Sequence, residues 1–169
     1  MIFCLSIMAY AQTPQDRATE LKKQAQSSLN QKDYIKARYL FKKAYEAFAS
    51  RENYPQAIEC GVQANALYVR ENFYKEGFEL CRDMEQLLWT GEQNKKKVFY
   101  DLRFLINKER LQMYTALKNP AQAKTQLDKL EEMANLAKND SLTEVLLYTK
   151  ANYYLSLIHI SEPTRQEAI

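Results

Sequence analysis

Apolar residues recur along this chain with the spacing of an α-helix. In the first clear segment, Leu21, Ala25 and Leu29 fall at steps of four residues, which places them on one helix face. A second segment begins after Asp33, whose carboxylate can accept the free N–H groups of a first helical turn and act as the N-cap. Its apolar face comprises Tyr34, Ala37, Phe41, Ala44 and Phe48. The pattern predicts two helices joined by a short turn.

This helix pair resembles a tetratricopeptide repeat. The family has a turn of the Gly-Asp-Tyr type, and its second helix carries a small residue, a large apolar residue and another small residue. Here these positions are Asp33-Tyr34, Ala37, Phe41 and Ala44. Lys32 stands at the place of the usual turn glycine, and Ser28 at that of an aromatic residue. The resemblance implies that helix pairs stack on their neighbours, because one pair cannot bury its apolar stripe alone.

Two further segments follow the same plan. "YVRENFYKEGFELCRDM" aligns Gly77 with Ala37, and "YTALKNPAQAKTQLDKL" aligns Ala123 with both. These residues lie 40 and 46 positions apart (37, 77 and 123), more than the family period of about 34 residues, so longer helices or connections are expected. We predict an all-α fold over residues 12–154. It consists of antiparallel helix pairs stacked as a tetratricopeptide-like α-solenoid, with about three repeats plus one orphan helix.

Two polar motifs mark expected helix starts. Asn119 followed by Pro120 is typical of an N-cap and a first helical position, where proline loses no hydrogen bond. Ser141 with Glu144 forms a capping-box pattern for a last helix that reaches Tyr154. Without a following partner helix, this orphan helix is expected to expose an apolar face.

Composition supports a helical chain and limits its partners. Hydrophobic residues are 46% and charged residues 27%, as in soluble globular proteins, and the chain has three glycines. Gly91, two residues after Trp89, is expected to be a helix C-cap. A net charge of +3 gives no indication of nucleic-acid binding without a clustered basic face. The run 95–97 of three lysines could contact an anionic partner, but we favour a solvated helix start.

The first residues indicate export. An apolar run at residues 2–8 precedes Ala9-Tyr10-Ala11, the small-x-small pattern that signal peptidases accept. Residues 1–11 are therefore expected to be a partial signal peptide, which would remove Cys4. The alternative is a frayed or buried apolar N-terminus. Export implies a periplasmic or other extracytoplasmic location.

The last residues do not continue the repeat pattern. The run "LSLIHISEPTR", with the single histidine His159, resembles the translation of a transposase-type adapter used in DNA sequencing libraries. Residues 166–169 fit the continuation of that adapter through an index sequence. We therefore interpret residues 155–169 as an adapter-derived tail and the natural chain as truncated. The alternative is a genuine amphipathic tail.

The residue types needed for catalysis and cofactor binding are sparse. With His159 set aside, no histidine is left for a Ser-His or Cys-His pair, and three scattered glycines cannot form a phosphate-binding loop. No catalytic, cofactor-binding or metal-ligating residue is predicted. Cys60 and Cys81 lie on different predicted helices, and two free buried thiols are favoured over a disulfide.

The resemblance also implies a binding surface. In this family the inner surface comes from the first helix of each pair, and its apolar middle and polar ends would suit another protein or an extended peptide. The recurrent tyrosines could line such a groove, although helical spacing favours the core. The corresponding residues are Lys22, Gln26, Leu29, Val62, Ala66, Val69, Lys108, Gln112 and Thr115.

These observations predict a non-catalytic binding module. Exported repeat arrays rich in tyrosine and lysine resemble the sensor regions of bacterial signalling proteins of the Bacteroidetes type, which precede a membrane helix and a histidine kinase or DNA-binding output. On this interpretation the membrane is reached only through a segment beyond this sequence. The alternatives are an envelope scaffold without output, an enzyme whose catalytic domain lies elsewhere, and a cytoplasmic adaptor.

Overall fold

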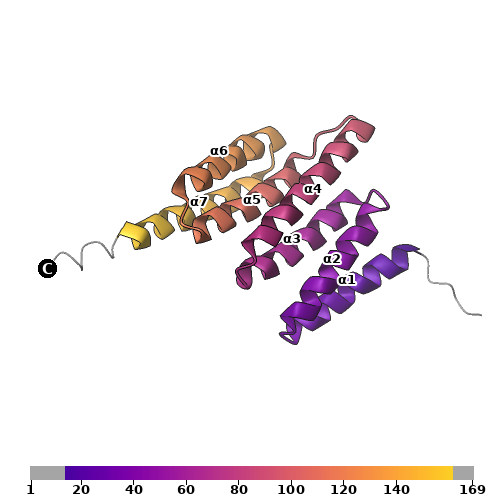
Figure 1. Ribbon diagram of the computed structural model, residues 1–169. Coiled ribbons are helices and arrows are strands. Elements are labelled where there is room, and N and C mark those ends of the chain that lie inside the picture. The colour runs from indigo at the N-terminus through magenta and orange to yellow at the C-terminus, as the bar shows by residue number, and fades with distance from the viewer. Residues whose placement is uncertain (1–13, 162–169) are drawn as a thin grey trace, which may run out of the picture.

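The computed structural model describes residues 14–161 of the 169-residue chain, with side chains for residues 17–158. The predicted signal segment 1–11 and the end of the predicted adapter-derived run lie outside the described residues. All regular secondary structure in the described part is helical (Figure 1). The helices are α1 (Pro14–Asn30), α2 (Tyr34–Ala49), α3 (Tyr54–Arg70), α4 (Tyr74–Lys95), α5 (Tyr100–Ala116), α6 (Pro120–Ala137) and α7 (Asp140–Ser161).

The helices form an array of antiparallel pairs. Each helix packs against the next one along the chain, and α3 with α5 and α5 with α7 make additional contacts across the array. The odd-numbered helices therefore form one layer, and α2, α4 and α6 form the other (Figure 1). The predicted all-α fold of stacked helix pairs is confirmed, with three pairs and one further helix in the described residues.

Four of the tight connections share one backbone geometry. In each, a residue in the left-handed conformation donates its N–H to the carbonyl three positions earlier, and the next N–H bonds the carbonyl five positions earlier. Glycine usually takes such positions because it has no Cβ to clash, yet here none is glycine. The residues are Lys32 (φ 62°), Glu52 (55°), Asn72 (61°) and Lys118 (53°). Lys32 thus occupies the conformation expected of the glycine that it replaces.

The predicted N-caps before α2 and α6 are confirmed. The side chain of Asp33 accepts the N–H of Lys36 at 3.2 Å, and Asn119 accepts that of Gln122 at 3.1 Å. Each bond satisfies an N–H group that has no partner inside its helix. Pro120 follows directly as the first residue of α6.

The core has two clusters that meet at α5. The first joins α1 to α5 and includes Ile106 and Met113; the second joins α5, α6 and α7 and includes Phe104 and Leu111. By helical periodicity these two pairs of α5 residues lie on opposite faces of the helix. One helix therefore supplies both clusters.

Small residues allow the close approach of helices that the sequence indicated. Ala37 and Ala123 are fully buried at the starts of α2 and α6. A Cβ on Gly77, their equivalent in α4, would lie 2.7 Å from Met113 Sδ and 3.0 Å from Asn65 Oδ1. A larger residue there would require the side chains of Met113 and Asn65 to move.

The predicted C-cap at Gly91 is wrong, because α4 continues to Lys95. Gly91 is buried within the helix, and a Cβ there would lie 2.5 Å from Cζ of Tyr54. The glycine therefore makes room for a tyrosine ring. The lysine run 95–97 also ends a helix rather than starting one, with Lys96 left-handed at φ 49°.

The last helix begins and ends at other residues than expected. Asn139, not Ser141, supplies the cap, since its side chain accepts the N–H of Ser141 at 3.0 Å. Helix α7 also continues past Tyr154 to Ser161, into the run interpreted as adapter-derived. A helix boundary does not identify the origin of the DNA, so that interpretation stays a prediction.

Candidate binding groove

The nine residues predicted to form the binding surface lie on three helices of one layer. Each is partly or largely exposed. The structure places Lys22, Gln26 and Leu29 on α1, Val62, Ala66 and Val69 on α3, and Lys108, Gln112 and Thr115 on α5.

Four of the six residues on α1 and α3 already make contacts within the fold. Lys22 Nζ lies 2.7 Å from a carboxylate oxygen of Glu59 and donates to Gln56 Oε1 at 2.9 Å, which ties α1 to α3. Leu29 and Val62 pack against the first core cluster, as does Val69. Much of their apolar surface is therefore already used within the fold.

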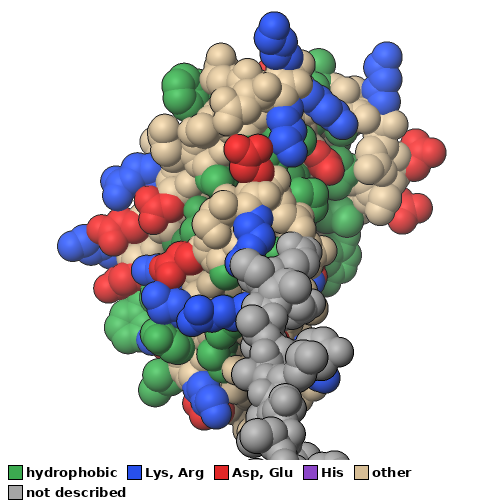
Figure 2. All heavy atoms as spheres, turned by 90° about the vertical axis from the view of Figure 1, so that its right-hand side faces the viewer, with side chains coloured by type: hydrophobic (Ala, Val, Ile, Leu, Met, Phe, Trp, Pro, Cys, Tyr) green, Lys and Arg blue, Asp and Glu red, His purple; other side chains and the backbone are tan. Residues whose placement is uncertain are grey.

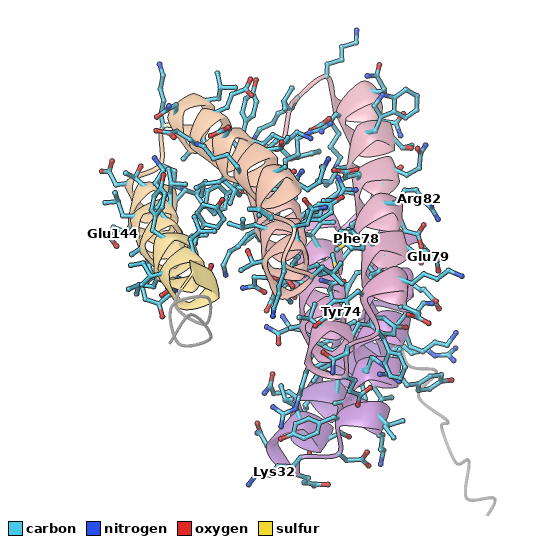
Figure 3. The ribbon with its side chains drawn as sticks, turned by 60° about the vertical axis from the view of Figure 1, so that its left-hand side comes forward. Lys32, Tyr74, Phe78, Glu79, Arg82 and Glu144 are labelled. Carbon is cyan, nitrogen blue, oxygen red and sulfur yellow. The ribbon has the colours of Figure 1, made fainter. Side chains whose placement is uncertain are left out.

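The residues on α5 line a groove. It has a volume of about 670 Å³ and lies between α5 and α7, two helices that are not neighbours along the chain. In Figure 3, Glu144 is labelled on α7. The groove is lined by Lys108, Leu111, Gln112, Thr115, Ala116, Glu144, Val145, Tyr148, Thr149, Asn152 and Tyr153.

Three of the four hydroxyl groups of the groove bond the protein itself. Thr115 Oγ1 donates to the carbonyl of Leu111 at 2.8 Å, and Thr149 Oγ1 donates to that of Val145 at 2.7 Å. The Tyr153 hydroxyl donates to the backbone carbonyl of Pro120 at 3.4 Å. These residues therefore present mainly their apolar parts to the groove.

Besides the exposed hydroxyl of Tyr148, four polar side chains in the groove make no hydrogen bond or ion pair with the described residues. Lys108 and Gln112 come from α5, and Glu144 and Asn152 from α7. They provide one positive charge, one negative charge and two amides that can each donate and accept. An apolar floor with a few free polar groups at its walls is typical of a binding groove.

A buried polar pair holds α3 to α5 behind this wall. Asn65 Nδ2 donates to Glu109 Oε2 at 3.1 Å, and both side chains are almost wholly buried. Burial raises the pKa of the Glu109 carboxyl, although the hydrogen bond from Asn65 and the charge of Lys108 act in the opposite direction. Asn65 Oδ1 has no hydrogen-bond partner.

Two ion pairs fasten α4 to α5. Arg103 Nε donates to Glu92 Oε1 at 2.8 Å, and Arg110 Nη2 donates to Glu85 Oε2 at 2.8 Å. The hydrogen bond from Arg103 is the main reason that the pKa of Glu92 is lowered. Because both arginines bond the carboxylates through two nitrogens, the orientation of α5 is well defined.

The α7 wall was not included in the predicted surface. The prediction used the first helices of three pairs and treated α7 as an orphan. The same rule applied to a fourth first helix would have included its exposed residues, such as Tyr148 and Asn152. Of the other described tyrosines, two are buried and four are partly buried against the core: Tyr45 and Tyr54, and Tyr34, Tyr68, Tyr74 and Tyr114.

Other candidate chemistry can be placed in the described residues. Cys60 and Cys81 are free and buried, as predicted, and burial raises the pKa of each thiol to about 12. Within residues 17–158, no group of three or more His, Cys, Asp and Glu side chains could hold a metal ion. No helix of the described part combines the length and apolar composition that a membrane crossing needs.

No protein-family model matches the chain, and the searches of curated proteins and of solved structures found no match either.

Proposed function

We propose that this chain is a non-catalytic binding module that holds an extended peptide or a helix of another protein in the groove between α5 and α7. The observation that carries the proposal is an apolar groove of about 670 Å³ with four free polar side chains on its walls. This volume lies within the range of roughly 300–1,000 Å³ that is usual for ligand pockets in proteins. The resemblance to tetratricopeptide repeats, which bind partners on their inner surface, supports it.

The groove also defines the chemistry of the partner. Leu111, Val145 and Tyr153 favour one or two apolar side chains at the centre. Lys108 and Glu144 favour an acidic and a basic group in the flanking positions, and Gln112 can bond a peptide backbone. A short amphipathic segment with mixed charge fits these groups.

A matched pair of variants tests the site. Gln112→Trp places a large side chain in the groove, whereas Gln26→Trp makes the same exchange at the predicted surface of α1, away from the groove. Peptides selected from a random display library on the unaltered chain are expected to lose binding to the first variant and keep it with the second. Equal binding to both variants would contradict the groove, and equal loss would indicate the wider predicted surface instead.

We also propose that the module is exported and acts as the sensor part of a bacterial signalling protein. The support is the apolar run at residues 2–8 with its small-x-small end, and the resemblance of tyrosine- and lysine-rich arrays to such sensors. An alkaline phosphatase reporter fused after Asn30 is expected to be active, because the reporter folds only outside the cytoplasm. An inactive reporter with normal expression would favour the cytoplasmic adaptor.

A further inference from the structure

The two helices that form the groove run in the same direction, because α5 and α7 are each antiparallel to α6 (Figure 1). Their relative position is fixed at one end by Tyr153 of α7. Its hydroxyl donates to the carbonyl of Pro120, which closely follows the end of α5. Tyr153 and Thr115 also line one small hollow together with Pro120. The last groove residues of α5 and of α7 therefore lie side by side.

From this end the two walls can be matched along the groove. On each wall the lining residues recur at steps of three or four positions, which is the spacing of one helix face. Four residues advance a helix by about 6 Å. Counting back from the matched end gives three levels across the groove: Thr115 with Asn152, Gln112 with Tyr148, and Lys108 with Glu144. The two charged residues of the groove thus lie at the same end, on opposite walls.

This charged end has a space between its two charges. Lys108 and Glu144 form no ion pair with each other or with another described residue. A partner with one negative and one positive group can enter this space, and each group then lies next to its complement. At the other end of the groove, Thr115, Ala116 and Asn152 carry no charge. Recognition of charge is therefore confined to one end.

We propose that the groove binds an extended peptide in which an acidic and a basic residue are neighbours in sequence, at one end of a short apolar run. This inference rests on the proposed function and specifies its partner. Neighbouring side chains of an extended chain point to opposite sides, so the acidic one meets Lys108 and the basic one meets Glu144. Two extended residues advance by about 6.6 Å, close to the spacing of the levels. Each level therefore takes two peptide residues, one against each wall.

The two free amides of the groove favour an extended peptide over a helix. Gln112 and Asn152 make no hydrogen bond with the described residues, and each amide can donate and accept. A helix bonds its own N–H and C=O groups along most of its length, whereas an extended peptide presents them to its surroundings. Leu111 and Val145 provide apolar contacts for the side chains that follow the charged pair.

The levels are held in place by the core. Leu111 on α5 and Tyr153 on α7 both belong to the second core cluster, so the two walls are joined behind the groove. Every lining residue of the groove precedes the run interpreted as adapter-derived, which begins at residue 155. The recognition site therefore does not depend on the origin of that run.

Peptide selection from a random display library on matched chains tests the inference. The unaltered chain is expected to select peptides with an acidic residue next to a basic one. Lys108→Glu makes both walls of the charged end acidic and should select two neighbouring basic residues. Glu144→Lys makes both walls basic and should select two neighbouring acidic residues. Lys23→Glu, at an exposed position of α1, is the control and should select the same peptides as the unaltered chain.

Fluorescence anisotropy with one selected peptide tests where the charged pair binds. An isomer of that peptide carries the basic residue at the opposite end, so its composition is unchanged. This isomer should bind about fivefold more weakly, the factor expected for the loss of one partly exposed ion pair. An isomer that binds equally well would mean that the two charges are not read at one end, and would overturn the inference.

Failure of this inference can be told apart from failure of the proposed function. Selected peptides that lose binding to Gln112→Trp but contain no neighbouring opposite charges would overturn the inference and leave the peptide groove in place. Selection of the same peptides by the unaltered chain, Lys108→Glu and Glu144→Lys would have the same meaning. If no peptide is selected, or if binding survives Gln112→Trp, both the inference and the groove are wrong.

Discussion

The two end helices of the array differ in the polarity of their exposed side chains. Every exposed residue of α1 in the described part is polar: Arg17, Thr19, Lys23, Gln24, Gln26, Ser27 and Asn30. On α7 the exposed residues from Leu147 onward are mostly apolar. Figure 2, which faces the N-terminal side of the molecule, shows lysine, arginine and acidic side chains interspersed over that surface. Repeat arrays need polar end helices to stay soluble, so α1 acts as a cap and α7 as an open end.

The two ends also differ in how firmly they are packed. Helix α1 packs along α2 over much of its length, while α7 contacts α6 more sparsely. Because local opening requires only the loss of the contacts that a segment makes, α7 should open at a lower free energy than α1. The comparison therefore predicts a stable cap and a loosely held open end.

The largest change in stability is expected from a substitution in the first core cluster, and it should differ from that of a substitution in the second. Phe41→Ala removes a fully buried ring from the first cluster and should lower the free energy of unfolding by about 3–5 kcal/mol. Tyr153→Ala in the second cluster should cost less, since α7 already opens more easily. Urea denaturation measures the first cost, and amide hydrogen exchange should show that the second is confined to α7. Equal global losses would contradict the comparison.

A smaller change in stability is expected from the ion pair between Arg103 and Glu92, which links α4 to α5. Arg103→Ala leaves the buried carboxylate of Glu92 without its partner and should cost about 2 kcal/mol. Arg82→Ala, at an exposed position of α4 labelled in Figure 3, is the control and should be near neutral. Thermal melting distinguishes the two. A neutral Arg103→Ala would mean that the ion pair does not hold α4 to α5.

A pH experiment tests the buried pair behind the groove. The pKa of Glu109 is raised by burial, so the folded state prefers the protonated carboxyl. The stability from this group is present below the pKa of an unfolded glutamate and is lost as pH rises through the raised pKa of the folded state. Glu109→Gln should remove this pH dependence and gain about 1 kcal/mol at pH 7.

The structural reason for that gain is the free oxygen of Asn65. A glutamine at position 109 can accept from Asn65 Nδ2 and also donate to Asn65 Oδ1, which has no partner. Unfolding in urea at pH 4 and pH 7 measures the change. A variant that keeps the falling stability between these pH values would show that another group causes it.

The smallest effects concern the turns. Lys32→Gly and Lys118→Gly should each stabilise the fold by about 0.5 kcal/mol, because glycine adopts the left-handed conformation without a clash. The greater freedom of glycine in the unfolded chain limits the gain. Melting temperatures of both variants check this, and a loss in either would mean that the lysine side chain contributes contacts at that turn.

Local patterns and contacts between distant helices were predictable to different degrees. Periodicity and caps indicated the helix pairs, and Asp33 and Asn119 cap the helices expected of them. Gly91 was misjudged because its neighbour, Tyr54, comes from another helix. The α7 wall of the groove and the partner of Glu109 were not predicted for the same reason. Such contacts depend on how helices far apart in sequence are placed, which no short pattern encodes.

Helix α5 has a mechanical consequence for the whole molecule. Ile106 and Met113 engage one core, and Phe104 and Leu111 on the opposite face engage the other. If α5 rotated about its axis, the side chains on its two opposite faces would move in opposite directions. Both cores would therefore be affected at once. Leu111 also lines the groove, so an occupant of the groove would contact α5 directly. A partner bound in the groove would therefore contact the one helix that both cores share.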